Sequence, residues 1–505
     1  MTWMNLLVAI PTPAQAAGYS FPQAWHDLQQ IGPIVLVALA MIAGILADLL
    51  VPRRARGVTV AAIAVAGYVL ALADCVYRWA AGGGGEAYFG FASGDKFALF
   101  FEALFGVLGL FTVAISEPYL RRRHLLRPEY HVLVLAAIAG MMALAASTSL
   151  VTVFLSLETF SVALYILSGY VRRDTRSQEA GAKYLLVGGF ASAVLLYGMA
   201  LTYGATGTTQ VDEIARAVAN QGASNPLLVL GILLMGVGFG YKISGAPFHQ
   251  WTPDVYQGAP LPVTTFMSVG TKAAAFAMIL TVFGNALGHL ASEWQVLLAF
   301  IAVCSMVVGN IGALAQSSLK RMLAYSGIAQ AGYVLVGVIG GGTEGVASVL
   351  FYLAAYLFMN FGAFAVLTVI SGHESDADRF QDLDGLGYRH PALGMMMAIF
   401  MLSLAGFPPL VGFFGKFTLF SSAVAHGWTW LAVVAVLASV VSVAYYLRVV
   451  LHVYTPARGR REEAESRLSL STVAITAVLT IALGVYPALL LAGGILGAAP
   501  VFASH

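Results

Sequence analysis

The sequence predicts an all-α protein that crosses a membrane about fourteen times, and three observations lead to this fold class. Of the 505 residues, 59% are hydrophobic and only 10% are Asp, Glu, Lys or Arg, whereas soluble domains carry about 25% charged residues. So few charges cannot cover a water-facing surface. Apolar stretches of the ~20 residues needed to span a bilayer recur along the chain. Stretches such as 31–51 are continuously apolar, whereas the strands of a membrane barrel alternate apolar and polar residues.

Fourteen candidate spans follow when the apolar stretches are divided at charges and at clusters of glycine and proline. They are predicted at 31–51, 57–79, 97–116, 130–148, 150–170, 179–203, 226–245, 259–283, 294–314, 322–340, 346–370, 391–425, 428–454 and 468–493. The longest polar connections, 204–225 and 371–390, are expected to be loops. Met1 to Ala17 resemble a secretion signal only weakly, because the apolar run is short and no basic residue precedes it. We therefore expect a retained N-terminal tail.

Composition also excludes several functions. A net charge of +2 is too small for a nucleic-acid binder, which needs a basic footprint. The two cysteines, Cys75 and Cys304, are too few for an iron–sulfur cluster, a cysteine zinc site or a disulfide scaffold. The chain has no dinucleotide-binding glycine motif in a βαβ setting. Redox cofactors are therefore not expected in this chain.

The basic residues predict how the chain is oriented in the membrane. Loops after odd-numbered spans hold 18 of the 26 basic residues, whereas loops after even-numbered spans hold three. Because cytoplasmic loops are enriched in Lys and Arg, the first set is expected in the cytoplasm and both termini on the outside.

Five basic residues fall within the spans instead, namely Lys183, Lys242, Lys272, Lys416 and Arg448. The chain has twenty arginines and six lysines, so four of the six lysines lie in apolar segments. Arginine stays charged in nearly any environment, whereas a buried lysine can release its proton. The use of lysine at these positions indicates proton transfer.

Depth separates functional charges from anchors. Lys272 lies ~20 Å into its span and Lys416 ~15 Å, and Lys242 and Glu158 are also deep. Each such charge costs about 2.5–3.5 kcal/mol on insertion scales, so the four together cost about 10–14 kcal/mol, which is comparable to the stability of a whole fold. Structural packing does not require this. Lys183 is close to the end of its span, where an anchor that reaches the interface is the alternative, and a static Glu–Lys pair is the alternative for Glu158.

Two segments interrupt the helical pattern. Proline removes a backbone donor, so Pro247 should break the seventh span, and Pro408 with Pro409 should break the twelfth. Broken helices at membrane depth are tolerated where they line a polar cavity, and a pair of them points to an internal repeat. Each break is accompanied by a lysine. His249 follows the first break and can carry protons at neutral pH, although a structural role fits it equally.

Nearly the whole chain resembles the antiporter-like membrane subunits of respiratory complex I, the NADH-quinone oxidoreductase. The resemblance lies in Glu158 and its neighbours, Lys242-Ile-Ser-Gly-Ala-Pro-Phe-His249, Trp251-Thr-Pro-Asp-Val-Tyr256, Lys272, and the segment from Gly406-Phe-Pro-Pro-Leu to Gly415-Lys416. It implies fourteen helices with two inverted five-helix repeats and broken helices seven and twelve. The implied parts are a tail at 1–30, helices 1–3 at 31–116, a first repeat at 130–283, a second repeat at 294–454 and helix 14 at 468–493. The resemblance implies three branches of the family: one has glutamate where Lys416 stands, and another continues after the last span into a long lateral helix. This chain has lysine at 416 and ends soon after span fourteen, so it fits the third branch.

The same resemblance implies a function. Glu158 is expected to stabilise protonated Lys242, from which the proton passes to Lys272 and His249 and then to Lys416, with Lys183 as a further proton-transfer residue. NADH, FMN, iron–sulfur clusters and quinone are expected in partner subunits. The expected neighbours in the bacterial inner membrane are another antiporter-like subunit on one side and small membrane subunits on the other. A subunit of a multisubunit cation/proton antiporter and a purely structural scaffold are the alternatives.

Overall fold

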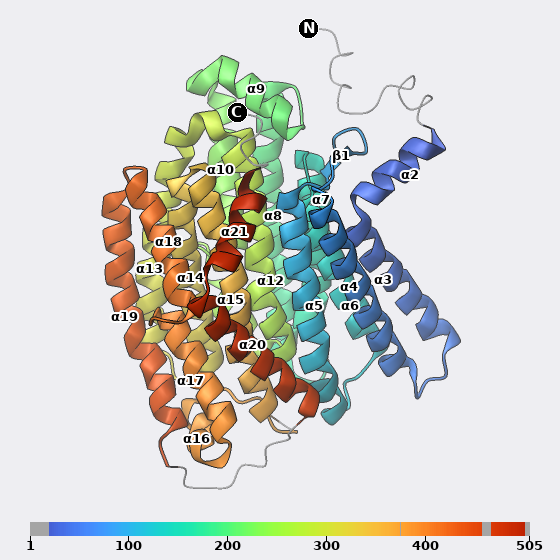
Figure 1. Ribbon diagram of the computed structural model, residues 1–505, viewed down its shortest axis with the longest axis vertical. Helices are drawn as coiled ribbons and strands as arrows, with labels where there is room; N and C mark the ends of the chain where they lie inside the picture. The colour runs from blue at the N-terminus through green and yellow to red at the C-terminus, as the bar shows by residue number, and fades with distance from the viewer. Residues whose placement is uncertain (1–19, 374, 457–465, 500–505) are drawn as a thin grey trace.

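The computed structural model describes residues 20–373, 375–456 and 466–499, and most of its helices run along one long axis (Figure 1). Within these residues, twelve helices are long and apolar enough to cross a membrane. They correspond to twelve of the fourteen predicted spans, and the other two predicted spans, 226–245 and 391–425, contain shorter helices. The predicted tail at Met1–Ala17 and three of the arginines predicted to be cytoplasmic, Arg458, Arg460 and Arg461, lie outside the described residues.

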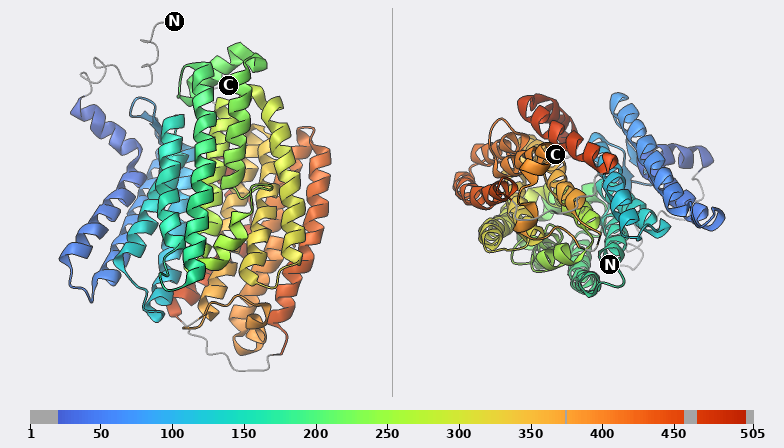
Figure 2. Two further views of the ribbon diagram at one scale, coloured as in Figure 1. Left: turned by 180° about the vertical axis from the view of Figure 1, so that it is seen from behind. Right: turned by 90° about the horizontal axis from the view of Figure 1, so that it is seen from below.

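The first part of the chain forms a peripheral group of helices that Figure 2 shows at one side of the bundle. Its elements are α2 (Phe21–Gln30), α3 (Gly32–Leu50), α4 (Arg56–Ala80), the strands β1 (Glu86–Ala87) and β2 (Ala92–Ser93), and α5 (Lys96–Arg122). The two strands pair antiparallel. Neither α2 nor this small hairpin is predicted by hydropathy, because both are too short and polar to resemble a span.

The middle of the chain contains the first broken helix. Its elements are α6 (Pro128–Ala145), α7 (Leu150–Ser168), α8 (Thr175–Thr206), α9 (Val211–Gln221), η2 (Gly222–Ser224), α10 (Pro226–Lys242), α11 (Trp251–Gly258), α12 (Leu261–Ile279), η3 (Leu280–Ala286) and η4 (Gly288–Leu290). As Pro247 predicts, α10 ends at Lys242 and the chain resumes as α11 after eight non-helical residues, 243–250.

The last part repeats this order of long helices, a broken helix and a further long helix. Its elements are α13 (Ala291–Leu314), α14 (Leu319–Gly340), α15 (Gly342–Ile370), η5 (Phe380–Leu383), α16 (Leu386–Arg389), α17 (Pro391–Ala405), α18 (Val411–Ala425), α19 (Thr429–Val453), α20 (Arg467–Val485) and α21 (Ala488–Ala498). The predicted break at Pro408 and Pro409 separates α17 from α18. The predicted final span, 468–493, consists of two helices, because α20 ends before Pro487.

One of the two predicted loops is wrong. The segment 204–225 contains α9, which is bent by 112° from α10 and lies across the end of the bundle. Its buried residues Val211, Ile214, Ala215 and Val218 recur at helical spacing. The sequence therefore carries the pattern of an amphipathic helix here, but the segment is too short and too polar to resemble a membrane span. The described residues of the segment 371–390, which leave out residue 374, form only the short η5 and α16.

The helix ends define two faces of the molecule. The arginine-rich face carries Arg53, Arg123, Arg172 and Arg379, in the connections that follow α3, α5, α7 and α15. The opposite face carries α2, the strand pair and α9, which Figure 1 shows together at the other end of the long axis. Successive helices alternate between these faces, so the structure separates the charges as the sequence predicts.

Burial differs between central and peripheral helices. Nearly every residue of α12, α14 and α15 is buried, whereas peripheral helices expose large apolar side chains, including Leu50, Leu186 and Phe190. A helix that is apolar all round is expected in the interior of a large protein or in lipid. The central helices are thus shielded from lipid by the chain itself, and they carry the candidate site.

Candidate functional site

The three deep lysines predicted from the sequence are all buried. Lys242 is 5% exposed, Lys272 is 2% exposed and Lys416 is 5% exposed. Lys242 is the last residue of α10, Lys272 lies in the middle of α12, and Lys416 lies in α18 after the second break. All three ammonium groups are enclosed by the protein, so these lysines do not act as anchors at the membrane interface.

Lys242 is held by a serine instead of directly by the expected glutamate. Its Nζ donates to Ser161 Oγ at 2.9 Å, and the ammonium also lies 5.9 Å from the ring centroid of Phe160. Ser161 is one helical turn after Glu158 on α7. Both Glu158 and Lys242 are described, and no ion pair or hydrogen bond joins them, while Glu158 Oε1 is buried without a partner. The structure therefore shows the two charged groups without direct contact, and Lys242 bonds to the hydroxyl of Ser161 instead.

A group of aromatic side chains separates Lys242 from Lys272. The rings of Tyr184 and Trp251 stack at 4.5 Å, Tyr241 lies 5.3 Å from Trp251, and Tyr256 lies 6.4 Å from it. Among the described residues of this region, several buried hydroxyls have no hydrogen-bond partner. They belong to Tyr165, Tyr241, Ser244 and Thr252. Buried polar atoms of this kind typically bind internal water.

Lys272 lies between the two halves of the site. Its Nζ donates to the hydroxyl of Tyr256 at 3.2 Å. A Cβ at Gly327 on α14 would lie 3.1 Å from Lys272 Nζ and 3.2 Å from the hydroxyl of Tyr356. The glycine thus leaves the space in which the ammonium and this second hydroxyl approach each other.

Gln330 connects the tyrosines beyond Lys272. Its Nε2 donates to the hydroxyl of Tyr446 at 2.9 Å and to the carbonyl oxygen of Leu404 at 3.2 Å, and its Oε1 accepts from the hydroxyl of Tyr352. The rings of Tyr352 and Tyr356 stack at 6.4 Å. This carboxamide is 1% exposed, and both of its polar atoms are satisfied.

A second carboxamide, Asn310, continues the polar contacts toward Lys416. Its Nδ2 donates to the hydroxyl of Tyr333 at 3.1 Å, and its Oδ1 accepts from the hydroxyl of Tyr445 at 3.0 Å. Tyr445 and Tyr446 are ring neighbours at 4.4 Å. The ammonium of Lys416 lies 4.9 Å from the ring centroid of Tyr333.

Lys416 binds the backbone freed by the second break. Its Nζ donates to the carbonyl oxygen of Ala405 at 3.0 Å and to Ser439 Oγ at 2.8 Å. Ala405 is the last residue of α17, and the final carbonyls of a helix have no intrahelical donor. Gly406 turns the chain with φ of 95°, and a Cβ there would lie 3.2 Å from Lys416 Cδ. The break and the lysine therefore stabilise each other.

The remaining two candidates, His249 and Lys183, lie away from this line of side chains. The half-buried His249 follows the first break, 6.2 Å from the ring of Tyr325, and its Nδ1 has no partner among the described residues. Lys183 is 43% exposed and pairs with Glu179 at 2.7 Å and Asp254 at 3.0 Å. Asp254 also pairs with Arg321 at 2.6 Å. Lys183 is thus part of a partly exposed ion-pair network.

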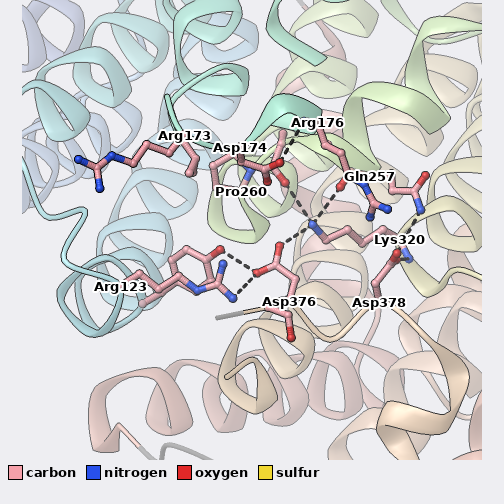
Figure 3. A pocket seen from close by; sticks show the side chains of 14 residues that line it. Arg123, Arg173, Asp174, Arg176, Gln257, Pro260, Lys320, Asp376 and Asp378 are labelled. Carbon is pink, nitrogen blue, oxygen red and sulfur yellow. Dashed lines mark hydrogen bonds and ion pairs between the residues drawn. The ribbon is translucent and has the colours of Figure 1, made fainter. Parts of the chain in front are cut away.

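An ion cluster on the arginine-rich face lies beside the turn between α11 and α12 (Figure 3). Asp376 pairs with Lys320 at 2.5 Å and with Arg123 at 2.9 Å, and it accepts from the hydroxyl of Tyr119 at 2.8 Å. Burial alone would raise the pKa of Asp376, but the two cations more than offset this and hold its pKa below the ordinary 3.8. These side chains line a hollow of about 480 Å³.

Lys320 connects this hollow to the turn between α11 and α12. Its Nζ donates to the carbonyl oxygens of Gln257 and Ala259, both at 3.2 Å, and Tyr256, the partner of Lys272, directly precedes this turn. Sequence analysis places Lys320 in a cytoplasmic loop, but it is only 3% exposed in the first turn of α14. It is buried because the 371–390 segment folds back over it.

Sequence reasoning misses the uncharged members of the site because it searches the spans for charges alone. The missed residues are Ser161, Tyr256, Asn310, Gln330, Tyr333, Tyr352, Tyr356, Ser439, Tyr445 and Tyr446. Asn310 and Gln330 were detectable as carboxamides inside apolar spans, which are costly unless they are hydrogen-bonded. The tyrosines carried no such signal. Within the described residues, no group of three or more His, Cys, Asp or Glu is placed to hold a metal ion.

Comparisons with known proteins agree with this arrangement. A family model described as "NADH:quinone oxidoreductase/Mrp antiporter, TM" matches residues 147–442. The NADH-quinone oxidoreductase subunit N of Trichlorobacter lovleyi is 45% identical over 432 residues, which cover 85% of this chain and 88% of the relative. The subunit N of Moorella thermoacetica is 41% identical, covering 90% and 89% of the two chains.

Two solved structures place the fold. A chain of respiratory complex I from Thermus thermophilus is 36% identical with a TM-score of 0.78, covering 91% of this chain and 98% of that chain. A chain of the Mrp complex from Dietzia has a TM-score of 0.83 at 21% identity, covering 94% and 98% of the two chains, which is a likeness of fold alone. The chain therefore belongs to the NADH:quinone oxidoreductase/Mrp antiporter family of membrane subunits.

Proposed function

We propose that this chain moves protons across the membrane as a membrane-arm subunit of an NADH-quinone oxidoreductase, with Glu158, Lys242, Lys272 and Lys416 as its proton-transfer groups. The observation that carries the proposal is that each lysine is buried, and each is bonded to a hydroxyl or a freed carbonyl that belongs to a larger polar network. Curated relatives with 40–45% identity over most of the chain bear the name subunit N. The lysine at 416 fits the same branch.

Protons reach the line from the arginine-rich face in this proposal. The hollow beside Asp376 ends at the α11–α12 turn, whose carbonyls bind Lys320, and Tyr256 then leads to Lys272. From Lys272 the carboxamide and tyrosine hydroxyls around Gln330 and Asn310 lead to Lys416. Internal water joins the steps that are too long for direct hydrogen bonds.

Glu158 controls the proton on Lys242. When the carboxylate approaches, it stabilises the ammonium, and when the two are apart the ammonium has only Ser161. Separation favours release of the proton toward Lys272. Lys183 and His249 are supporting proton-transfer residues. Lys183 exchanges between Glu179 and Asp254, and the half-buried His249 lies beside the first break.

The energy comes from other subunits in this proposal. NADH oxidation and quinone reduction, with FMN and the iron–sulfur clusters, take place in partner subunits. Another antiporter-like subunit adjoins one side and small membrane subunits adjoin the other. The protein lies in the bacterial inner membrane with the arginine-rich face in the cytoplasm and both termini outside. Segments 130–283 and 294–454 form the two inverted repeats, consistent with the matching order of helices and breaks.

The test uses the whole respiratory complex in liposomes and compares proton uptake with quinone reduction. Lys272→Met removes the central ammonium at nearly equal length, and Lys96→Met is the matched control, because Lys96 lies at the start of α5 over the ring of Trp79. We expect Lys272→Met to lower the number of protons moved per NADH in a complex that assembles normally. Normal pumping in all three variants, Lys272→Met, Lys242→Met and Lys416→Met, would contradict the proposal and would favour a purely structural role for the chain.

The antiporter alternative predicts a different outcome. A chain from a cation/proton antiporter would co-purify without flavin or iron–sulfur absorbance and would exchange protons for sodium. Purification from native membranes with identification of the bound subunits separates the two functions.

A further inference from the structure

A row of polar positions runs along α5, outside the proton line described above. Asp95 caps the helix, and Glu102, Gly109, Ser116 and Arg123 follow at intervals of seven residues. Seven residues make about two turns, or ~10.5 Å, so these positions share one face of the helix. The row begins at the opposite face and ends at the arginine-rich face, where Arg123 pairs with Asp376.

Glu102 is the buried ionisable group of this row. It is 1% exposed, and neither carboxyl oxygen has a hydrogen-bond partner in the described part of the chain. Its charged neighbours are Asp95 on its own helix and the pair Asp74 and Arg78 on α4, which bond each other at 2.7 Å. An unpaired carboxyl group in a membrane interior is costly and is by default a functional candidate.

A small hollow lies at the opposite face, beside Asp95 at the start of the row. It measures about 50 Å³ and is lined by Asp95 together with Ser93, Thr148 and Asp212, and a site of ~10–15 Å³ accommodates one water molecule. Asp95 is close enough to Glu102 for the two carboxyl groups to interact electrostatically. Asp95 is thus the acidic residue of the row that borders the hollow, ~10.5 Å along the helix from Glu102.

Tyr68 separates this outer half from the inner half of the row. The tip of its ring packs on Gly109, where a Cβ would lie 2.7 Å from the ring, and Tyr68 is 0% exposed. Beyond it, Ser116 Oγ and the hydroxyl of Tyr130 bond at 2.8 Å. His131 lies next to Tyr130 with a ring separation of 5.3 Å. As far as the structure describes the chain, both ring nitrogens of His131 and the Tyr68 hydroxyl lack hydrogen-bond partners.

We propose that α4, α5 and α6 hold a second proton-binding line, in which Glu102 binds a proton and exchanges it with the opposite face through Asp95. The carboxyl group of Glu102 releases its proton to a chain of water molecules that leads past Asp95 to the hollow, and it regains a proton the same way, so no other bond changes. The ring of Tyr68 blocks proton movement from Glu102 toward Tyr130 and the arginine-rich face, so protons do not leak across the membrane along this line. Apart from Arg123, which also lines the hollow beside Asp376, this line shares no residue with the one that runs through Lys242, Lys272 and Lys416.

Opening the barrier tests the line. In liposomes that contain the assembled complex without NADH, Tyr68→Ala should raise passive proton permeability at least about tenfold, and Tyr68→Ala combined with Glu102→Gln should return it to the parent value. Phe105→Ala is the matched control, because Phe105 is an equally buried aromatic residue of α5 outside the row. The proposal is overturned by a tight Tyr68→Ala complex, by an equal leak in Phe105→Ala, or by a leak that persists after Glu102→Gln.

Infrared spectroscopy provides a second test that does not depend on Tyr68→Ala folding. The parent complex should show a carboxylic acid C=O band that responds to pH on the opposite face and is missing in Glu102→Gln. Lys272→Met should retain this band, so a failure of the proposed pumping function leaves this test unaffected. A spectrum that Glu102→Gln does not change, or a band that responds only to pH on the arginine-rich face, refutes the proposal.

Discussion

Replacing Asp376 by asparagine is predicted to destabilise the folded chain by about 3–5 kcal/mol, the cost of removing one partner from a buried ion pair. The loss should exceed the about 0–1 kcal/mol of a surface pair, because Lys320 is 3% exposed and lies 2.5 Å from the carboxylate. Asparagine preserves shape and an acceptor for Tyr119, but the ammonium would keep only the carbonyls of Gln257 and Ala259 as partners.

Unfolding of the purified protein in detergent measures this change. Asp48→Asn is the matched control, because Asp48 forms a half-exposed pair with Arg56 at 3.4 Å and surface pairs contribute about 0–1 kcal/mol. The double variant Asp376→Asn with Lys320→Met should recover much of the loss, since it removes the unpaired ammonium, while Arg123, the other partner of Asp376, still donates to the carbonyl oxygen of Gly372. Equal effects of Asp376→Asn and Asp48→Asn, or no recovery in the double variant, would refute the reasoning.

The pKa of Asp376 gives the same prediction a pH dependence. Because its pKa lies below the ordinary 3.8 in the folded chain, its contribution to stability is complete above about pH 4 and is lost as pH falls through the lowered value. The stability of the parent should therefore approach that of Asp376→Asn only in strong acid. A difference between the two proteins that stays constant below pH 4 would contradict this assignment.

Three further variants test the central line. Gln330→Leu leaves the Tyr352 hydroxyl and the Leu404 carbonyl without their partner, at about 1–3 kcal/mol each, while the Tyr446 hydroxyl keeps Ser326. It should lower proton pumping by about tenfold or more while the complex still binds its subunits. Ser161→Ala removes the hydrogen bond of Lys242 and should slow pumping, with Ser161→Thr restoring it in the same liposome assay. Gly406→Ala forces a side chain into the left-handed region, at about 1–2 kcal/mol, and presses on Lys416, so it should lower both thermal stability and pumping; a neutral Gly406→Ala would contradict the assigned geometry.

Charge and proline patterns predict the fold and the charged part of the site well. The breaks after Lys242 and Ala405 follow from Pro247, Pro408 and Pro409, because proline acts locally on the helix that contains it. The burial of the three lysines follows from their depth in long apolar segments. These features depend on a few neighbouring residues, and the sequence displays them directly.

Contacts between distant segments are not predictable in this way. Ser161 resembles any serine of an apolar helix until α7 and α10 pack together and place it against Lys242. Lys320 looks like a loop cation because the segment that buries it lies some fifty residues further along the chain. Glu102 also lies deep in a predicted span, but a search directed at cations and at the family's glutamate passed over it.

The contact between Lys416 and Ala405 has a mechanical consequence. The C-terminal end of α17 carries the partial negative charge of its peptide dipoles, and the ammonium neutralises it at 3.0 Å. Once the amine is neutral, that attraction disappears, and the two half-helices are held together less tightly. Loading and unloading a single hydrogen ion would thus alternately tighten and loosen a hinge, so that chemistry at one nitrogen becomes movement that an adjoining subunit can sense.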